Sequence, residues 1–442
     1  MKLYNKIIKN YLLVYIIFLS QLFADLIHPP DENVLNYIHV MFKWEAVEHA
    51  TEYEFELSSS SDFYNRLISD KVVDIQYLVT EKISWESTYY WRVRTVGDSW
   101  MNTYSFTTGQ TRSNVTVIMH DESQYAEGNT IFGTADGLYS AIIDKNGTEI
   151  WNSGDNNIIY YNFLDDGNNF VYPDKGFFGT QYNETLEFPY PSIKFSLTDG
   201  ILWQEPNNEY AHHEIMELPW GDYMGITHKV ELGPICATTG GDWWWEYYDQ
   251  GFSANCSTPE YPWWGDHLVI WDDVTKDTLW TWSTFDHFNF MDYDSNTWDS
   301  EVPLNNGYYD WTHINAFYFD KRDSSIYIST RNLSRITKIQ YPSGDIIWNM
   351  GRESASGDVT FGHDLGFSYQ HSISLTNEDN ILIFDNGVYA PAYWGADGPT
   401  SRALEIAVSG SDGNYSASLA FEYILPVNLF GLTAGNAQQL EN

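Results

Sequence analysis

The sequence predicts an all-β protein, in which a small β-sandwich precedes a six-bladed β-propeller. Three observations predict this class. Aromatic residues, which favour strands, are abundant, with 19 Trp, 33 Tyr and 24 Phe. No segment keeps a helical period of apolar residues, and Gly, Asn and Asp recur at short intervals. From about residue 115, a turn followed by a strand that ends in tryptophan recurs along the chain, as in repeat proteins.

Residues 1–24 have the pattern of a cleaved signal peptide. Three lysines precede the apolar run 11–19, and residues 22–24 (LFA) offer a cleavage site. The run is too short to span a bilayer comfortably, and no later segment is apolar enough to do so. We therefore expect the mature protein to be exported to the periplasm or the exterior, without membrane insertion.

The chain is strongly acidic, with a formal net charge of −39. Removal of the three lysines of residues 1–24 changes this value from −39 to −42. Such a charge argues against nucleic acids and anionic membranes as partners. An anionic substrate would then need a local cationic pocket, whereas the acidity as a whole is typical of a surface adapted to solubility or salt.

The chain has two cysteines, Cys236 and Cys256, in an insertion rich in Trp and Gly. In an exported protein, a pair separated by 20 residues predicts a disulfide that closes this loop. A metal site would need more ligands than these two thiols. The triplet 212–214 (HHE) lacks the H-E-x-x-H pattern of zinc proteases, so no metal site is predicted there.

Residues 29–108 alternate apolar and polar positions, as in Tyr53–Leu57 and Tyr90–Arg94. This period of two is typical of strands buried on one face. The pattern W-x-x-V-x-x-A-x-x-Y-x-F-x-L, followed by YYWRVR, resembles the fibronectin type III domain. Because that fold says little about function, we expect a docking module or spacer.

Residues 115–442 contain the repeat that predicts a propeller. The recurring strands end at Trp151, Trp203, Trp280 and Trp348. A second recurring turn leads into a neighbouring strand, as in 218–223 and 376–381. Constant strands with variable insertions are typical of propeller blades. Five units are complete, and a sixth begins at residue 435 and stops, so the last blade is expected to be truncated and the chain to be a fragment.

Three histidines occupy similar places in these units. His213 lies eight residues before Gly221, His371 lies eight residues before Asp379, and His313 precedes a slightly longer turn. Equivalent positions in different blades converge on the central channel of a propeller. We therefore expect these side chains to meet, although they are far apart in the sequence.

Asn315 and Arg331 extend this candidate site. Asn315 lies two residues after His313, which places both on one face of an extended segment. Arg331 follows a predicted strand and supplies planar donors that suit an oxyanion. Two imidazoles, a carboxamide and a guanidinium together indicate a site for an anionic group.

The motifs HHEIMELPWGDYM, DWTHINAFYF, STRNLS, QHSISL and GNAQQLEN resemble the bacterial arylsulfate sulfotransferase family from about residue 115 onward. The resemblance implies a six-bladed propeller that transfers a sulfuryl group from a phenolic sulfate ester to a phenol. It implies no nucleotide sulfate donor and no cofactor. It also implies ping-pong kinetics through a sulfated histidine, here His371. Arg331, His313 and Asn315 would hold the sulfuryl oxygens, and His213 would complete the pocket.

Two other functions remain open at this point. The first is a non-catalytic propeller of the cell surface that binds a ligand or partner. The second is a dehydrogenase with a quinone cofactor, although such propellers usually have eight blades and a calcium site. The sequence also leaves the oligomeric state open, with a homodimer as one alternative.

Overall fold

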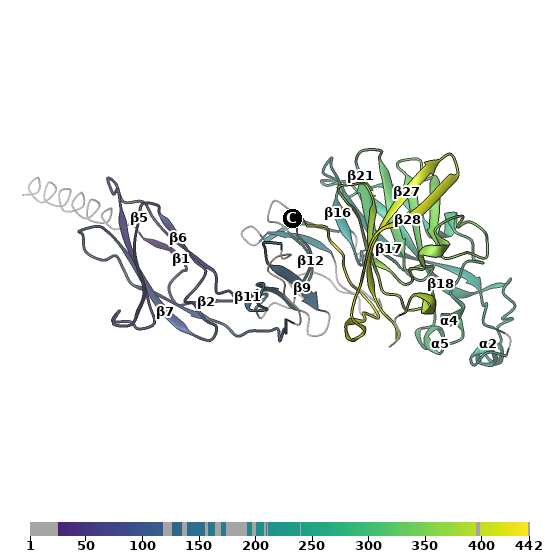
Figure 1. Ribbon diagram of the computed structural model, residues 1–442, viewed down its shortest axis with the longest axis horizontal. Helices are drawn as coiled ribbons and strands as arrows, with labels where there is room; N and C mark the ends of the chain where they lie inside the picture. Colours follow the sequence, from purple (N-terminus) through teal and green to yellow (C-terminus); the bar gives the residue numbers. More distant parts are fainter. Residues whose placement is uncertain are drawn as a thin grey trace, which may run out of the picture. The chain divides into compact units, whose positions relative to one another are not determined.

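The computed structural model describes residues 25–117, 126–134, 139–154, 158–163, 169–173, 192–196, 200–206, 209, 211–238, 240–394 and 398–440 (Figure 1). Its regular structure is almost entirely β-strand, which confirms the all-β class. Two compact units divide the chain, Met1–Tyr160 and Tyr161–Asn442. The predicted signal peptide, residues 1–24, lies outside the described residues. Within the described part, no helix is long and apolar enough to cross a membrane.

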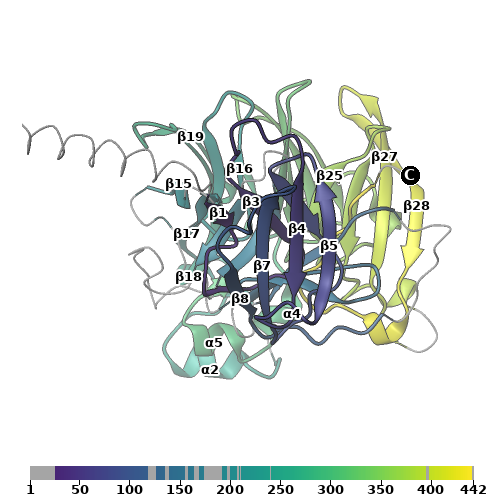
Figure 2. The same ribbon diagram turned by 90° about the vertical axis from the view of Figure 1, so that its left-hand side faces the viewer.

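The first unit contains two sheets whose strand orders are β1-β3-β6 and β2-β8-β7-β4-β5. Figure 2 shows β4, β5 and β7 of the larger sheet side by side. The strands of both sheets are β1 (Leu26–His28), β2 (Asn33–Leu35), β3 (Val40–Trp44), β4 (Tyr53–Ser58), β5 (Arg66–Val72), β6 (Gln76–Val79), β7 (Thr88–Thr95) and β8 (Tyr104–Thr108).

One hydrophobic core joins these two sheets. On β3, Phe42 and Trp44 are buried while Lys43 between them is exposed, as the alternating pattern predicts. The ring of Phe42 contacts those of Phe55 and Trp91, with centroid separations of 4.9 and 5.1 Å. Aromatic side chains from both sheets therefore fill the interior.

A third sheet of the first unit has the order β11-β10-β9 and comprises β9 (Thr130–Thr134), β10 (Tyr139–Ile143) and β11 (Glu149–Asn152). Two hydrogen bonds attach it to the segments before it: Ile38 N–H donates to Ile150 O at 2.9 Å, and Trp85 Nε1 donates to Glu149 O at 2.7 Å. These contacts extend the compact unit to residue 160, whereas the sequence suggested a division between residues 108 and 115.

The second unit is a series of four-stranded antiparallel meanders, with β12 beginning at the boundary between the units. The first two sheets are β12 (Ile158–Phe163), β13 (Asn169–Pro173), β14 (Ile193–Ser196) and β15 (Gly200–Gln204), then β16 (Ile215–Glu217), β17 (Tyr223–Pro234), β18 (Pro259–Trp271) and β19 (Thr278–Ser283). The next two are β21 (Ile314–Asp320), β22 (Ser325–Thr330), β23 (Arg335–Gln340) and β24 (Ile346–Gly351), then β25 (His371–Leu375), β26 (Ile381–Asp385), β27 (Arg402–Ser411) and β28 (Asn414–Ile424). The short β20 (Tyr309–Asp310) pairs with β18 in parallel.

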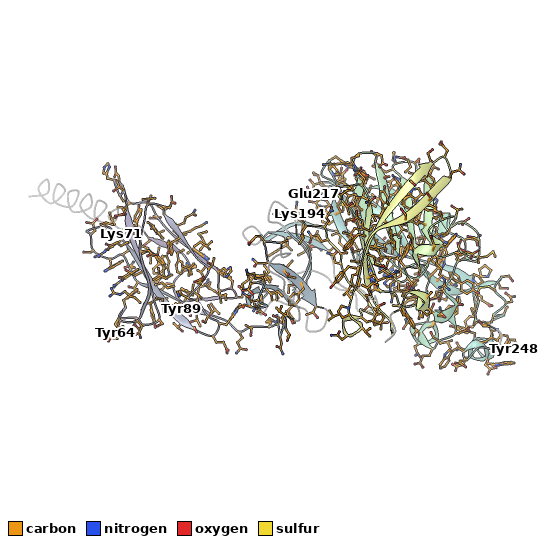
Figure 3. The ribbon with its side chains drawn as sticks, in the orientation of Figure 1. Tyr64, Lys71, Tyr89, Lys194, Glu217 and Tyr248 are labelled. Atoms are coloured by element: carbon orange, nitrogen blue, oxygen red, sulfur yellow. A yellow bond between two sulfur atoms is a disulfide. The ribbon has the colours of Figure 1, made fainter. Side chains whose placement is uncertain are left out.

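Consecutive sheets of the second unit share hydrophobic cores. The three cores are represented by Trp203 and Trp271, by Ile270 and Ile328, and by Met350 and Ile383. An ion pair between Lys194 of β14 and Glu217 of β16 also joins the first two sheets, and Figure 3 labels both side chains. Each sheet is therefore covered by the next along the chain.

The recurring tryptophans take equivalent places in the sheets. Trp203, Trp280 and Trp348 each lie on the last strand of their own sheet, namely β15, β19 and β24. The second recurring turn lies between the first and second strands, as between β16 and β17 or between β25 and β26. The repeat read from the sequence thus corresponds to one sheet.

Short helices lie in the connections, and they are α2 (Trp244–Asp249), α3 (Thr284–His287), α4 (Ser295–Trp298), α5 (Val302–Asn306), η2 (His363–Leu365), η3 (Pro391–Tyr393) and η4 (Val427–Leu429). The insertion between β17 and β18 carries α2. Cys236 and Cys256 form a disulfide across this insertion, with an S–S distance of 2.06 Å. Tyr247 of α2 is fully buried against the rings of Tyr261 and Trp298, so the insertion packs into the core that the neighbouring sheets share.

Candidate active site

The three predicted histidines lie where the first strands of three consecutive sheets begin. His213 precedes β16 by two residues, His313 immediately precedes β21, and His371 is the first residue of β25. The backbone φ angles of His213 and His313 are +61° and +52°, in the left-handed region that costs energy for a side chain with a Cβ. Such strained positions are concentrated at functional sites.

His213 and His313 are in contact. Their ring centroids are 4.9 Å apart, and the rings meet edge to face. Burial, followed by the neighbouring His313, holds the pKa of His213 well below its usual range. His213 is therefore a neutral imidazole at neutral pH. Its Nδ1 lies 2.8 Å from Nδ1 of His212.

The hydrogen bonds of His371 fix its tautomer. Its Nδ1 lies 2.8 Å from Oδ1 of Asn386. The Asn386 amide cannot be turned around, because its Nδ2 donates to the carbonyl oxygens of Gly431 and Ala434, both at 2.9 Å. Oδ1 must therefore accept, so Nδ1 of His371 carries the proton and Nε2 carries a lone pair.

That lone pair makes Nε2 the position at which the imidazole can accept a hydrogen bond or act as a nucleophile. Burial, and to a smaller extent the charge of Arg331, lower the pKa of His371 to about 4 against the opposing effect of its hydrogen bond with Asn386. The imidazole is thus neutral over the physiological range. Nε2 accepts a hydrogen bond of 3.2 Å from the backbone N–H of Ala434, which lies in the segment after β28.

His313 is oriented by a carboxylate. Its Nδ1 lies 2.6 Å from Oδ2 of Asp310, a residue of β20. Burial opposes ionisation of Asp310, but His313 and then Arg331 outweigh it and bring the pKa of Asp310 down to about 2. Asp310 is therefore ionised, and its carboxylate accepts from Nδ1 of His313. This is the arrangement that positions the base in serine hydrolases.

Arg331 follows the end of β22 and supplies the positive charge. Its Nη1 donates to Oδ1 of Asn332 at 3.0 Å, and its guanidinium lies 4.6 Å from the ring centroid of Tyr369. Its Nε is buried without a hydrogen-bond partner in the described part of the chain. A buried hydrogen-bond donor without a partner raises the free energy of the folded protein. An anion bound at this position would accept from Nε and remove that cost.

Asn315 is buried, and part of its amide group is already hydrogen-bonded within the protein. Its Nδ2 donates to the carbonyl oxygen of Gln370 at 2.8 Å, so one amide hydrogen is committed to the residue before His371. Gln370 in turn donates to the carbonyl oxygens of Thr330 and Arg335, at 3.2 and 3.1 Å. Gln370 therefore connects the start of β25 to the two ends of the loop that carries Arg331, and Asn315 of β21 bonds to Gln370.

A cavity of about 360 Å³ opens onto His313 and Arg331. Its walls include the rings of Tyr308, Tyr309, Tyr369 and Tyr389. Aromatic walls around one cationic and one imidazole side chain suit an aromatic ligand that carries a negative group. The shape and chemistry of this cavity thus match a small aryl anion.

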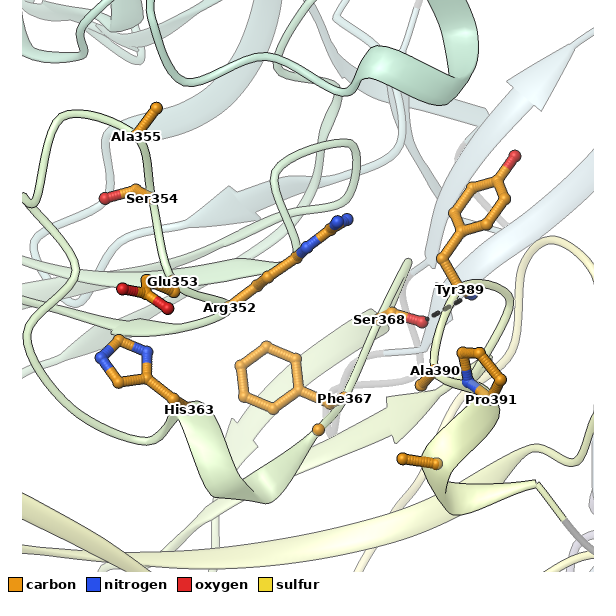
Figure 4. Close-up of a pocket in the computed structure, with 12 residues that line it drawn as sticks. Arg352, Glu353, Ser354, Ala355, His363, Phe367, Ser368, Tyr389, Ala390 and Pro391 are labelled. Atoms are coloured by element: carbon orange, nitrogen blue, oxygen red, sulfur yellow. Dashed lines mark hydrogen bonds between the residues drawn. The ribbon is translucent and has the colours of Figure 1, made fainter.

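A second cavity, of about 840 Å³, shares Tyr389 with the first (Figure 4). It is lined by Arg352, Glu353 and His363, and contains none of the five predicted site residues. Tyr389 is held by its backbone N–H, which donates to Oγ of Ser368 at 3.0 Å. The smaller cavity is the better candidate, because His313 and Arg331 line it. His213, Asn315 and His371 are not among its lining residues.

Sequence reasoning missed three residues of this site: Asp310, Asn386 and Tyr369. Asp310 lies three residues before His313, a spacing that gives no sign of contact outside a helix. Asn386 follows the strand after His371 in the motif DNG, which reads as an ordinary turn. The hydroxyl of Tyr369 donates to Asp294, and this anchor holds the ring under Arg331.

Comparisons with known proteins support a sulfotransferase. Residues 254–422 match the family model Arylsulfotransferase (ASST), a stretch that includes His313, Arg331 and His371. No curated protein matches the chain. Two solved structures resemble it weakly: a protein of unknown function from Bacteroides thetaiotaomicron and Hsv2 of Kluyveromyces lactis. The first is 13% identical to this chain, with a TM-score of 0.28. The match covers 90% of this chain and 86% of that protein. The second is 7% identical to this chain, with a TM-score of 0.23. The match covers 90% of this chain and 99% of that protein. Neither likeness carries an argument about fold or function.

Proposed function

We propose that this protein is an aryl sulfotransferase that moves a sulfuryl group from a phenolic sulfate ester to a phenolic acceptor through a sulfohistidine, without a nucleotide sulfate donor. One observation carries the proposal: the neutral His371 presents a lone pair on Nε2 beside the charge of Arg331, whose Nε lacks a partner. The family match over residues 254–422 supports the general activity.

In the first half of the reaction, Nε2 of His371 attacks the sulfur of the donor ester. The N–S bond forms as the bond between sulfur and the aryl oxygen breaks, and the electron pair leaves with the phenolate. The imidazolium of His313, stabilised by Asp310, gives its proton to that oxygen. Arg331 neutralises charge on the sulfuryl oxygens, as cationic groups do in phosphoryl transfer.

The second half reverses these steps with another phenol. The neutral His313 accepts the proton of the acceptor hydroxyl, whose oxygen attacks sulfur and releases His371. His213, in contact with His313, would hold a sulfuryl oxygen or the aryl oxygen. Two successive transfers through one covalent intermediate give ping-pong kinetics.

The arrangement of the second unit supports a propeller as the scaffold. Successive sheets share hydrophobic cores, and the site histidines begin the first strands of three of them. In a propeller these strand ends face the central channel. The proposal includes six blades.

We also propose that the protein is exported and that residues 29–108 form a fibronectin type III-like spacer. The disulfide between Cys236 and Cys256 supports an oxidising compartment. The shared core of the two N-terminal sheets supports a sandwich, and Ile150 of β11 packs into the same core.

The test is an assay of the purified protein with 4-nitrophenyl sulfate, with and without phenol. Release of nitrophenolate that depends on phenol, with phenyl sulfate as the product, supports the proposal. Release with inorganic sulfate as the product and no need for phenol would identify a sulfatase instead. A folded protein that releases no nitrophenolate would support the alternative of a non-catalytic binding propeller.

The pH dependence of donor cleavage should follow the protonation of the His371 imidazole. Because its pKa is about 4, the imidazole is unprotonated at higher pH. We expect kcat/KM for 4-nitrophenyl sulfate to be level above about pH 5 and to fall about tenfold per pH unit below 4. Activity regained on return to pH 7 would separate titration from unfolding. An inflection near pH 6.5, about the ordinary pKa of histidine, would contradict the proposal that the nucleophile is the buried, neutral His371.

Replacing Asp310 by asparagine should slow the reaction most for donors whose phenolate is a poor leaving group. The variant removes the charge that stabilises protonated His313, so proton donation weakens. We expect kcat for phenyl sulfate to fall about 10-fold to 100-fold, whereas 4-nitrophenyl sulfate, whose phenolate leaves without help, should change little. Equal losses with both donors would show that His313 does not protonate the leaving group.

A further inference from the structure

A second cluster of side chains lies next to the candidate active site and has no part in the proposed chemistry. It consists of His212, His228 of β17 and Asp266 of β18. His228 and Asp266 lie directly opposite each other in the β17–β18 ladder. The backbone N–H of His212 donates to Ile226 O at 2.8 Å, which brings this residue against β17. The rings of His212 and His228 are stacked, with centroids 3.9 Å apart.

The donor atoms of the three side chains lie close together. One ligand atom from each residue lies within 4.8 Å of the other two. Nε2 of His212 is 3.4 Å from Oδ1 of Asp266. Two donors bound to one tetrahedral zinc ion, with bonds of about 2.0–2.1 Å, are separated by about 3.3 Å. The spacing of this pair is therefore already that of two ligands.

The environment also suits a cation. Nε2 of His228 is buried without a hydrogen-bond partner in the described structure. The other oxygen of Asp266, Oδ2, accepts from Thr312 Oγ1 at 2.5 Å and from the backbone N–H of Ile314 at 2.7 Å. These bonds fix the carboxylate and leave Oδ1 directed at the cluster, as outer hydrogen bonds do around metal ligands.

We infer that Nε2 of His212, Nε2 of His228 and Oδ1 of Asp266 bind a divalent transition metal, for which zinc has the matching ligand preferences. Two imidazoles and one carboxylate are a common ligand set for zinc, and three protein ligands leave one position for water.

A metal at this place would act on His213. If Nε2 of His212 binds the ion, its Nδ1 must carry the proton and donate to Nδ1 of His213, 2.8 Å away. His213 then carries its own proton on Nε2, where it can donate to an oxygen of the substrate. This consequence rests on the proposed function, whereas metal binding itself does not.

The test is direct metal binding to the whole protein after removal of metals with a chelator. Titration with Co²⁺, whose tetrahedral complexes absorb visible light, and with Zn²⁺ followed by elemental analysis should each give one equivalent per chain. In the His228→Phe variant we expect the affinity to fall about 100-fold or more. Asp266→Asn, which keeps an acceptor for Thr312 and Ile314, should weaken binding as well.

His287→Phe is the matched control, because His287 also stacks on an aromatic ring, that of Trp282 at 4.6 Å, and lies outside the cluster. It should bind one equivalent with unchanged affinity. A folded wild-type protein that binds no stoichiometric Zn²⁺ or Co²⁺ would overturn the inference. So would unchanged affinity in folded His228→Phe. Neither result depends on sulfuryl transfer, so failure of the proposed activity leaves this test intact.

Discussion

Replacing His371 by asparagine should reduce sulfuryl transfer by at least about 10³-fold, since the variant has no nucleophile to carry the group. The wild-type protein incubated with 4-nitrophenyl sulfate in the absence of an acceptor should gain the mass of one SO₃ group on His371. The variant should gain none. Rates of nitrophenolate release and the intact mass of the protein are the two measurements.

His363→Asn is the appropriate control for this variant. His363 lines the neighbouring cavity, and its Nδ1 donates to Gly351 O at 2.9 Å, without touching the proposed site. It should retain nearly full activity. If His371→Asn kept activity within about tenfold of the wild type, or if the SO₃ group appeared on another side chain, the nucleophile would have to be reassigned.

Replacing Asp292 by alanine should lower the free energy of unfolding of the second unit by about 3–5 kcal/mol. Asp292 and Arg335 form an ion pair at 2.6 Å in which both side chains are almost completely buried. The carboxylate also accepts from the backbone N–H and the hydroxyl of Ser356, at 2.8 and 2.6 Å. Loss of Asp292 would leave the Arg335 charge buried without its partner, which is the costly case. Urea unfolding followed by tryptophan fluorescence measures the change.

Two further variants show whether the loss of stability comes from the unpaired buried charge of Arg335 or from unspecific disruption of packing. In Lys338→Ala the lost partner is the half-exposed Asp323, so we expect a change of only about 0.2–1 kcal/mol. The double variant Asp292→Leu with Arg335→Met removes both charges and should recover much of the lost stability. A loss below about 1 kcal/mol in Asp292→Ala would show that water or another group solvates Arg335 in the variant.

The sequence revealed features that depend on local patterns. The alternation in residues 40–44 correctly predicted which side chains are buried, because a strand exposes every second residue to one side. The recurring tryptophan marked the last strand of four sheets, namely β11, β15, β19 and β24. The equivalent positions of His213, His313 and His371 could be read from their distance to a turn, since the repeat keeps that distance.

The remaining features depend on contacts between distant segments. Nothing in the sequence shows that Asn386 would contact His371, or that Ala434 would reach its other nitrogen. The cluster of His212, His228 and Asp266 was missed for the same reason. Its ligands come from a loop and two paired strands, and their register is set by the long β17–β18 hairpin rather than by a local motif.

The hydrogen bond from Ala434 to His371 has a consequence for the sulfated state. Once Nε2 is bonded to sulfur it has no lone pair, so the N–H of Ala434 loses its acceptor. The nearest replacement is an oxygen of the newly attached sulfuryl group. The same amide that masks the resting nucleophile would then become an oxyanion donor, and its hydrogen exchange would report which form of His371 is present.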